Sequence, residues 1–176
     1  MEKLYSESDW QQVTEQLGRS PRGFYKVTKY HPQKKHPMVI QVIPWVEKAP
    51  FPTMYWLTCP ILKKQLSHLE KDRLIKVIES DHLAQKPELL ESLRSDHKNY
   101  RDERIELFNK TVKNWDELPE AQRKIIEETG IGGMADFDHV KCLHLHYAYH
   151  LALEGTGGGT IGNLVDELFP IIKSHY

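Results

Sequence analysis

The sequence predicts an α+β fold in which a small antiparallel sheet from the N-terminal third packs against a C-terminal helical bundle. Segments rich in β-branched and aromatic residues cluster before residue 60, at 24–30, 38–43 and 54–58. Apolar residues at helical spacing dominate the chain after residue 60. This segregation of strands and helices is typical of α+β proteins. At 176 residues the chain fits one domain, 1–176, with residues 1–20 as a helical extension.

The first predicted element is a helix over residues 8–17. Ser8 and Gln11 have the spacing of a capping box, and Gly18 is suited to end the helix.

Three strands are predicted next. Residues 24–30 (FYKVTKY) alternate in character, whereas 38–43 (MVIQVI) are apolar almost throughout, as expected of a buried strand. Three prolines make 44–53 extended but unsuitable for a central strand. Residues 54–58 (MYWLT) complete the set.

Helices follow the strands. Pro60 suits the first position of a helix, with Thr58 or Cys59 as its N-cap. The remaining helices are expected over 73–80, from 87 for more than 20 residues, from 119 to just before 130, over 136–154 and over 162–169.

Composition limits the classes of protein that the chain fits. Lys and Arg total 24 against 25 Asp and Glu, so a net charge of -1 excludes a generally basic nucleic-acid binder and an acidic tail. No apolar run is long enough to cross a membrane, and the N-terminus lacks a signal-peptide core, so we expect a cytoplasmic protein. Two cysteines cannot form a disulfide framework.

Cys59 stands at the predicted junction of a strand and a helix. A thiol at a helix N-terminus can act as a nucleophile or a metal ligand. The alternative is a small buried residue beside a helix-initiating proline, since free cysteines are commonly buried.

The segment 140–150 (VKCLHLHYAYH) combines one cysteine with three histidines on a predicted helix. Cys142 and His146 have the i, i+4 spacing that suits a metal ion. Cys142 and His144 would lie about 160° apart on a regular helix, too far apart for one ion unless the helix is distorted. The alternative is a helix buried on two sides, with the histidines as core and surface residues.

His97, Tyr100 and Arg104 form one stripe on the long predicted helix. A histidine, a phenol and a guanidinium together could bind an anion or supply an acid/base pair. The alternative is a solvated helix face, because the surrounding sequence SDHKNYRDER is polar almost all round.

Two further segments have weaker signals. The loop GTGGGTIG precedes a helix and could bind phosphate through backbone N–H groups, with candidates Gly157, Gly158, Gly159 and Gly162. It lacks a Walker lysine and a preceding strand, so a flexible connector is the alternative. Residues 19–36 hold six Lys or Arg and no acid among aromatic residues, a pattern that could meet single-stranded nucleic acid locally. The balanced charge of the whole chain disfavours that partner.

Several of these segments together resemble a bacterial family, the domain of unknown function family 501. The resemblance is collinear over about residues 24–165, the family-like core. It rests on FPTMYWLTCP (51–60), Ser67-His-Leu-Glu70, His97-x-x-Tyr100-x-x-x-Arg104, GGMAD (132–136) and VKCLH (140–144).

The resemblance implies which residues to favour, although it brings no activity with it. The residues that match the family motifs are Cys59, Glu70, His97, Tyr100, Arg104, Lys141, Cys142 and His144. The catalytic candidates among them are Cys59, Glu70, His97, Tyr100, Arg104 and Lys141, and the candidate metal ligands among them are Cys59, Cys142 and His144. His146 and His150 match no motif. Many relatives carry cysteine where His31 stands, and zinc accepts either residue as a ligand, whereas an all-cysteine iron–sulfur cluster fits the exchange less well.

Three hypotheses for function follow, and enzyme activity stays open among them. The first is a metal site, with zinc the expected ion, in which the ligands are His31, Cys59 and Cys142, with His144 or His36 as the fourth. The second is a metal-free enzyme with Cys59 or Cys142 as a thiolate nucleophile, a histidine as base, and Arg104 and Lys141 holding an anionic substrate.

The third hypothesis is a non-catalytic interaction module. A protein partner would dock on an N-terminal aromatic surface made of Trp10, Phe24, Tyr25, Trp45, Phe51, Tyr55 and Trp56. The motif residues would then be internal struts, with Arg104 paired to a carboxylate such as Glu70.

Overall fold

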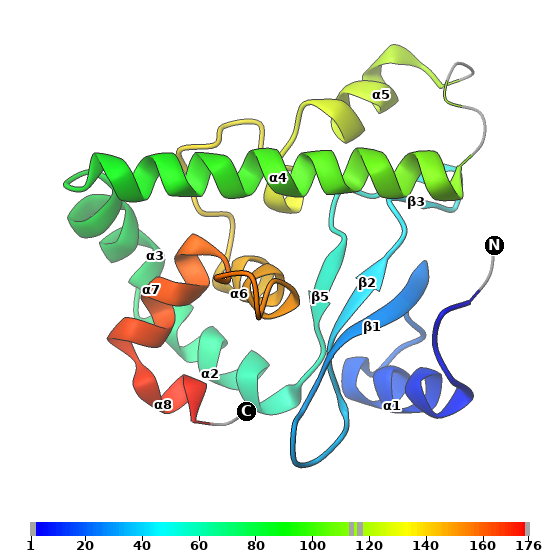
Figure 1. Ribbon diagram of the computed structural model, residues 1–176, viewed down its shortest axis with the longest axis horizontal. Coiled ribbons are helices and arrows are strands. Elements are labelled where there is room, and N and C mark those ends of the chain that lie inside the picture. Colours follow the sequence, from blue (N-terminus) through cyan, green and yellow to red (C-terminus); the bar gives the residue numbers. More distant parts are fainter. Residues whose placement is uncertain (1–2, 113–114, 116–117, 175–176) are drawn as a thin grey trace.

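The computed structural model (Figure 1) has the predicted α+β architecture and describes residues 3–112, 115 and 118–174, so both ends of the predicted domain lie outside the described residues. Three strands form an antiparallel sheet in the order β1-β2-β5, and two more form a short hairpin. The strands are β1 (Phe24–Tyr30), β2 (Pro37–Val42), β3 (Trp45–Val46), β4 (Ala49–Pro50) and β5 (Tyr55–Leu57). The helices are α1 (Glu7–Leu17), α2 (Pro60–Lys71), α3 (Leu74–Val77), α4 (Pro87–Thr111), α5 (Glu120–Glu127), α6 (Leu143–Ala152), α7 (Thr160–Leu168) and α8 (Pro170–Lys173), with a π-helical segment over Ile78–Leu83 and a 3-10 turn over Ile131–Gly133.

The sheet is covered on both faces. Val39 and Leu57 belong to the main core, which the C-terminal helices build. Ile40 and Val42 belong to a second core with Val13 of α1. Because successive side chains of a strand point to opposite faces, a strand between two cores must be apolar on both. All six residues of β2 are buried, which confirms the buried strand that the sequence predicts.

Helix α1 begins one residue earlier than predicted, and its cap is a different pair. Ser6 and Asp9 form the capping box: the Ser6 hydroxyl accepts from the Asp9 backbone N–H at 3.1 Å, and the Asp9 carboxylate accepts from the Ser6 N–H at 2.9 Å. Ser8 and Gln11 therefore do not form the capping box. The same spacing of three residues occurs twice in this segment, and the earlier pair, Ser6 and Asp9, forms the cap. Gly18 ends the helix in the left-handed conformation, as predicted.

Helix α6 is the central helix and contacts β5, α2 and α7 (Figure 1). Seven of its ten residues are buried, which confirms the two-sided buried helix. Its start differs from the prediction of 136. Gly132 and Gly133 take left-handed conformations in the turn before it, and Cys142 is extended, with φ −162° and ψ 155°. The helix consequently begins only at Leu143.

Helix α4 spans the length of the molecule in Figure 1. Its sequence is polar, yet His97, Tyr100 and Arg104 are at most 1% exposed. The solvated-face alternative for this stripe is therefore wrong, because these side chains reach inward to backbone groups rather than outward to water.

Candidate functional site

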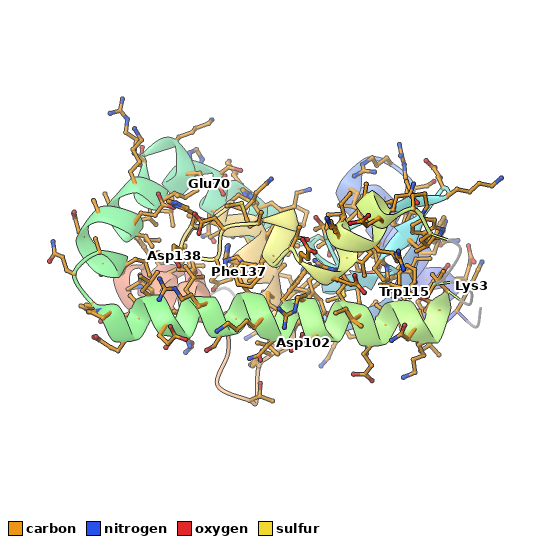
Figure 2. The ribbon with its side chains drawn as sticks, turned by 90° about the horizontal axis from the view of Figure 1, so that it is seen from above. Lys3, Glu70, Asp102, Trp115, Phe137 and Asp138 are labelled. Carbon is orange, nitrogen blue, oxygen red and sulfur yellow. The ribbon has the colours of Figure 1, made fainter. Side chains whose placement is uncertain are left out.

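The α2–α6 junction brings three potential ligand side chains together. Glu70, near the end of α2, and Cys142 and His144, at the start of α6, each offer one ligand atom, and these atoms all lie within 4.8 Å of one another. No other group of three or more His, Cys, Asp or Glu side chains is this close within the part of the chain that the structure describes. In the view of Figure 2, the segment that contains Phe137 and Asp138 lies between Glu70 and helix α4.

The turn before α6 explains how two residues at i and i+2 converge. A Cβ on Gly132 would lie 2.5 Å from a methyl carbon of Leu145 and 3.2 Å from Cγ of Lys141. Its φ of +65° is also a conformation that favours glycine. The glycine thus lets this turn pack directly on α6. Since Cys142 precedes the first helical residue, the helical angle of 160° between it and His144 does not apply.

Glu70 links the two helices. Its Oε1 accepts the backbone N–H of Leu143 at 2.6 Å, which satisfies a donor that the start of α6 would otherwise leave unpaired. The same oxygen lies 3.1 Å from Nδ1 of His144. A carboxylate at a helix N-terminus is also favoured by the helix dipole.

The hydrogen bonds of His144 fix its tautomer. Its Nε2 lies 3.0 Å from the carbonyl oxygen of Lys63, which can only accept, so Nε2 carries a proton. The Ser67 hydroxyl already donates to that carbonyl and therefore accepts from Nε2 at 3.2 Å. In the neutral ring, Nδ1 then presents a lone pair to the Glu70 carboxylate. Two acceptors 3.1 Å apart need a cation between them, either a proton or a metal ion.

Cys142 is partly buried, and burial raises the pKa of its thiol. Glu70 raises this pKa further, whereas the backbone N–H groups of Leu145 and His144 and the charge of Lys141 lower it. A protonated thiol is a poor nucleophile. This environment argues against a metal-free thiolate nucleophile, and a metal ion would have to displace the thiol proton on binding.

The other predicted ligands lie elsewhere. Cys59 is 2% exposed at the N-terminus of α2, eleven residues from Glu70, or roughly 16 Å along the helix axis. His31 follows β1, and its Nδ1 accepts the backbone N–H groups of Gln33 and Lys34. Neither residue belongs to a group of three close ligands among the described residues. The His36 ring contacts that of His31 in a tilted arrangement, with 4.9 Å between ring centroids and an interplanar angle of 46°.

The side chains of the α4 stripe, His97, Tyr100 and Arg104, form hydrogen bonds with backbone groups. His97 Nδ1 accepts the Ile131 N–H at 3.0 Å, and its Nε2 donates to the His139 carbonyl at 3.2 Å. The Tyr100 hydroxyl accepts the Met54 N–H at 2.5 Å.

Arg104 donates to four carbonyl oxygens, those of Pro52, Ile126, Thr129 and Gly130. Burial lowers its pKa to about 10. Its partners are thus backbone oxygens, whereas the interaction-module hypothesis paired it with Glu70. These contacts connect the 51–60 motif with the loop that leads to α6. Lys141 belongs to the same loop, but its side chain is exposed.

The glycine-rich loop packs on His150. A Cβ on Gly162 would lie 2.2 Å from Cβ of His150, and one on Gly158 would lie 2.5 Å from its Nδ1. The N–H of Thr160, at the start of α7, donates to the Asp96 carboxylate at 2.6 Å. A phosphate at Gly157, Gly158, Gly159 and Gly162 would have to compete with that carboxylate.

Much of the N-terminal aromatic surface is packed internally. The Phe24 ring is 4.0 Å from that of Tyr5, and Phe51 and Trp56 contact each other with centroids 5.7 Å apart. In the basic segment, Arg22 pairs with Glu47, and Lys29 with Glu154. These pairs reduce the positive charge available to nucleic acid.

The sequence does not single out Glu70 as a potential metal ligand, and it does not indicate the pocket beside His144. An open pocket of about 300 Å³ lies there, bordered by residues of α1, the 51–57 segment, α2 and α6: Leu17, Phe51, Thr53, Trp56, Leu57, Lys63, His144 and Leu145. The only signal for both was membership of the resembling motifs, which does not say what the residues contact.

A comparison with known families agrees with the motifs. None of the helices among the described residues has the length and apolar character needed to cross a membrane. No curated protein and no solved structure shows a significant match to the chain. Residues 28–167 match the family described as "Protein of unknown function (DUF501)". Because this match covers most of the chain, the protein belongs to the DUF501 family.

Proposed function

We propose that the protein binds one zinc ion, or a similar divalent transition-metal ion, through Glu70, Cys142 and His144. Carboxylate, thiolate and imidazole are all zinc ligands. In a tetrahedral site with bonds of about 2.0 Å, the ligand atoms are about 3.3 Å apart, close to the 3.1 Å between Glu70 Oε1 and His144 Nδ1.

The observation that carries the proposal is the tautomer of His144. Histidines that bind metals typically donate their other ring N–H to a carbonyl or carboxylate, which orients the ring. The contact of Nε2 with the Lys63 carbonyl has this form, and it leaves Nδ1 facing Glu70 with no proton of its own in the neutral ring. A bound cation accounts for that arrangement.

Three protein ligands leave a fourth position for water or substrate. Catalytic zinc sites also have three protein ligands and one open position, and in hydrolytic ones the metal lowers the pKa of a bound water. His144 also lines the neighbouring pocket, so a substrate held there would lie beside one of the three ligands. We therefore favour a metal-dependent hydrolytic protein over a closed structural zinc site.

The test is metal content of protein purified without a histidine tag, followed by titration of the metal-free protein with Zn²⁺ and Co²⁺. We expect one equivalent in the wild type and a thiolate-to-Co²⁺ charge-transfer band. Cys142→Ser should abolish the band, and Glu70→Gln, which keeps an oxygen for the Leu143 N–H, should weaken binding about 10- to 100-fold.

Cys59→Ser and His31→Asn are the matched controls, since neither residue is near the three ligands, and both should bind like the wild type. Absence of stoichiometric metal in the wild type would overturn the proposal, and unchanged affinity in Cys142→Ser would exclude the three-ligand site by removing Cys142 from it.

A further inference from the structure

The pocket beside His144 has the size of a small-molecule site. Its volume of about 300 Å³ is at the lower end of the range for ligand pockets. An engineered cavity of about 150 Å³ accepts benzene, so this one has room for a single ring with a short chain. The pocket is open to solvent on one side, and residues of four separate segments border it.

The walls are mainly apolar and aromatic. Trp56 and Phe51 meet at an interplanar angle of 55°, and Leu17, Leu57 and Leu145 supply aliphatic surface. The indole N–H of Trp56 donates to the Thr53 carbonyl at 3.3 Å, so that donor is already satisfied within the protein. The ring therefore offers its apolar surface to a ligand.

The charged groups around this pocket are cationic. Lys63 lines it, and the Arg19 guanidinium lies 5.1 Å from the centroid of the Trp56 ring. Neither cation forms an ion pair with any carboxylate that the structure describes, and no Asp or Glu lines the pocket. Lys63 Nζ has one long contact, 3.4 Å, to the Gln16 carbonyl.

We propose that this pocket binds a small amphipathic carboxylate, in which one aromatic or branched apolar group fills the space between Trp56 and Leu145 while the carboxylate pairs with Lys63. Apolar burial supplies the affinity, and the unpaired cations select the charge of the ligand. The pocket does not require a metal, so this proposal goes beyond the metal site, although His144 borders both.

The test uses metal-free protein and three probes of one shape: 3-phenylpropanoate, its neutral amide and the corresponding amine. We expect the carboxylate to bind at least tenfold more tightly than the amide in calorimetry, and the amine more weakly still. The indole N–H signal of Trp56, assigned through its loss in Trp56→Phe, should shift on titration with the carboxylate.

Two variants separate the pocket from non-specific binding. Lys63→Met keeps the aliphatic stem and should weaken carboxylate binding about tenfold, whereas Lys64→Met, at the exposed neighbouring position of α2, should change it less than twofold. Leu17→Trp should fill the pocket and abolish binding.

Equal affinity for acid and amide, unchanged affinity in Lys63→Met, or no shift of the Trp56 signal would each overturn the proposal. Because no metal is added, these outcomes are independent of whether Glu70, Cys142 and His144 bind zinc.

Discussion

Cys142 and His144 each place one potential ligand atom within 4.8 Å of the Glu70 carboxylate. They converge because Cys142 precedes helix α6 in an extended conformation, whereas His144 lies in the first turn of the helix. The geometry of the candidate site is therefore set by where α6 begins. That start depends on the turn packed against it, in which Gly132 has φ +65° and lies directly against Leu145.

Gly132→Ala should consequently affect both stability and metal binding. The added Cβ would be 2.5 Å from Leu145 and would take an unfavourable φ, so we expect a loss of about 1–3 kcal/mol in urea unfolding and weaker Zn²⁺ binding. Gly155→Ala is the control. Its φ is +95°, but nothing lies within 4 Å of the new Cβ, so stability should fall without any change in zinc affinity. Equal zinc affinity in both variants would contradict this account of the site.

Arg104→Met should be among the most destabilising substitutions in α4. The guanidinium is fully buried and supplies donors to four carbonyl oxygens, and methionine leaves those acceptors without them. Each unsatisfied buried group costs about 1–3 kcal/mol, so a total loss above about 3 kcal/mol is expected. Arg101→Met, which removes only a surface pair with Asp102, should change stability by less than about 0.5 kcal/mol. Similar urea midpoints for the two variants would argue against a stabilising role for the hydrogen bonds of Arg104.

Glu103→Gln should stabilise the protein in a pH-dependent manner. Burial raises the pKa of Glu103, which hydrogen bonds from Tyr55 and Tyr149 and the charge of Lys26 only partly offset. A group with a raised folded-state pKa contributes stability below its unfolded value, and this contribution is lost as pH rises through the folded value. The advantage of the glutamine variant should therefore grow between pH 4 and pH 7 in urea titrations. Glu106→Gln, at an exposed neighbouring position, should show a smaller trend of the same sign, because the Glu106 charge is only one of the contributions that raise the pKa of Glu103.

The sequence was sufficient for the secondary structure wherever a local signal decided it. Pro60 begins α2 with Cys59 as the N-cap, and the apolar 38–43 segment is the central strand, as predicted. The start of α6 could not be predicted in this way, because the tight packing of Gly132 and Gly133 on Leu145 and Pro52 decides it. Those contacts exist only in the folded chain.

The candidate site was predictable in part. The sequence singles out Cys142 and His144 and places both in the zinc hypothesis, although the angle between them on a regular helix disfavours a common ion. It indicates Glu70 only as a catalytic candidate. Periodicity assumes that a helix is continuous, and the predicted helix over 136–154 is not.

The stripe on α4 illustrates the opposite error. Its polar sequence favours a solvent-exposed helix face, whereas the side chains of Tyr100 and Arg104 form hydrogen bonds with buried backbone groups.

His146 provides the sharpest contrast with its neighbour His97. Both rings are buried, with centroids 5.4 Å apart, but His97 bonds two backbone groups, whereas Nε2 of His146 has no partner within the described part of the protein. Burial lowers the pKa of His146 to about 3, so the folded ring stays neutral while the unfolded one binds a proton near pH 6.5. Wild-type stability should therefore fall as pH decreases from 6.5 toward 3.

We expect His146→Leu to be neutral or stabilising by about 1 kcal/mol at pH 7 and to reduce that loss at low pH, because it removes an unsatisfied polar atom. His97→Leu should instead destabilise by about 2 kcal/mol or more, since it leaves the Ile131 N–H and the His139 carbonyl unpaired. Urea unfolding of both variants at pH 7 and pH 4.5 distinguishes these outcomes, and a larger loss in His146→Leu than in His97→Leu would mean that His146 has a polar partner in solution.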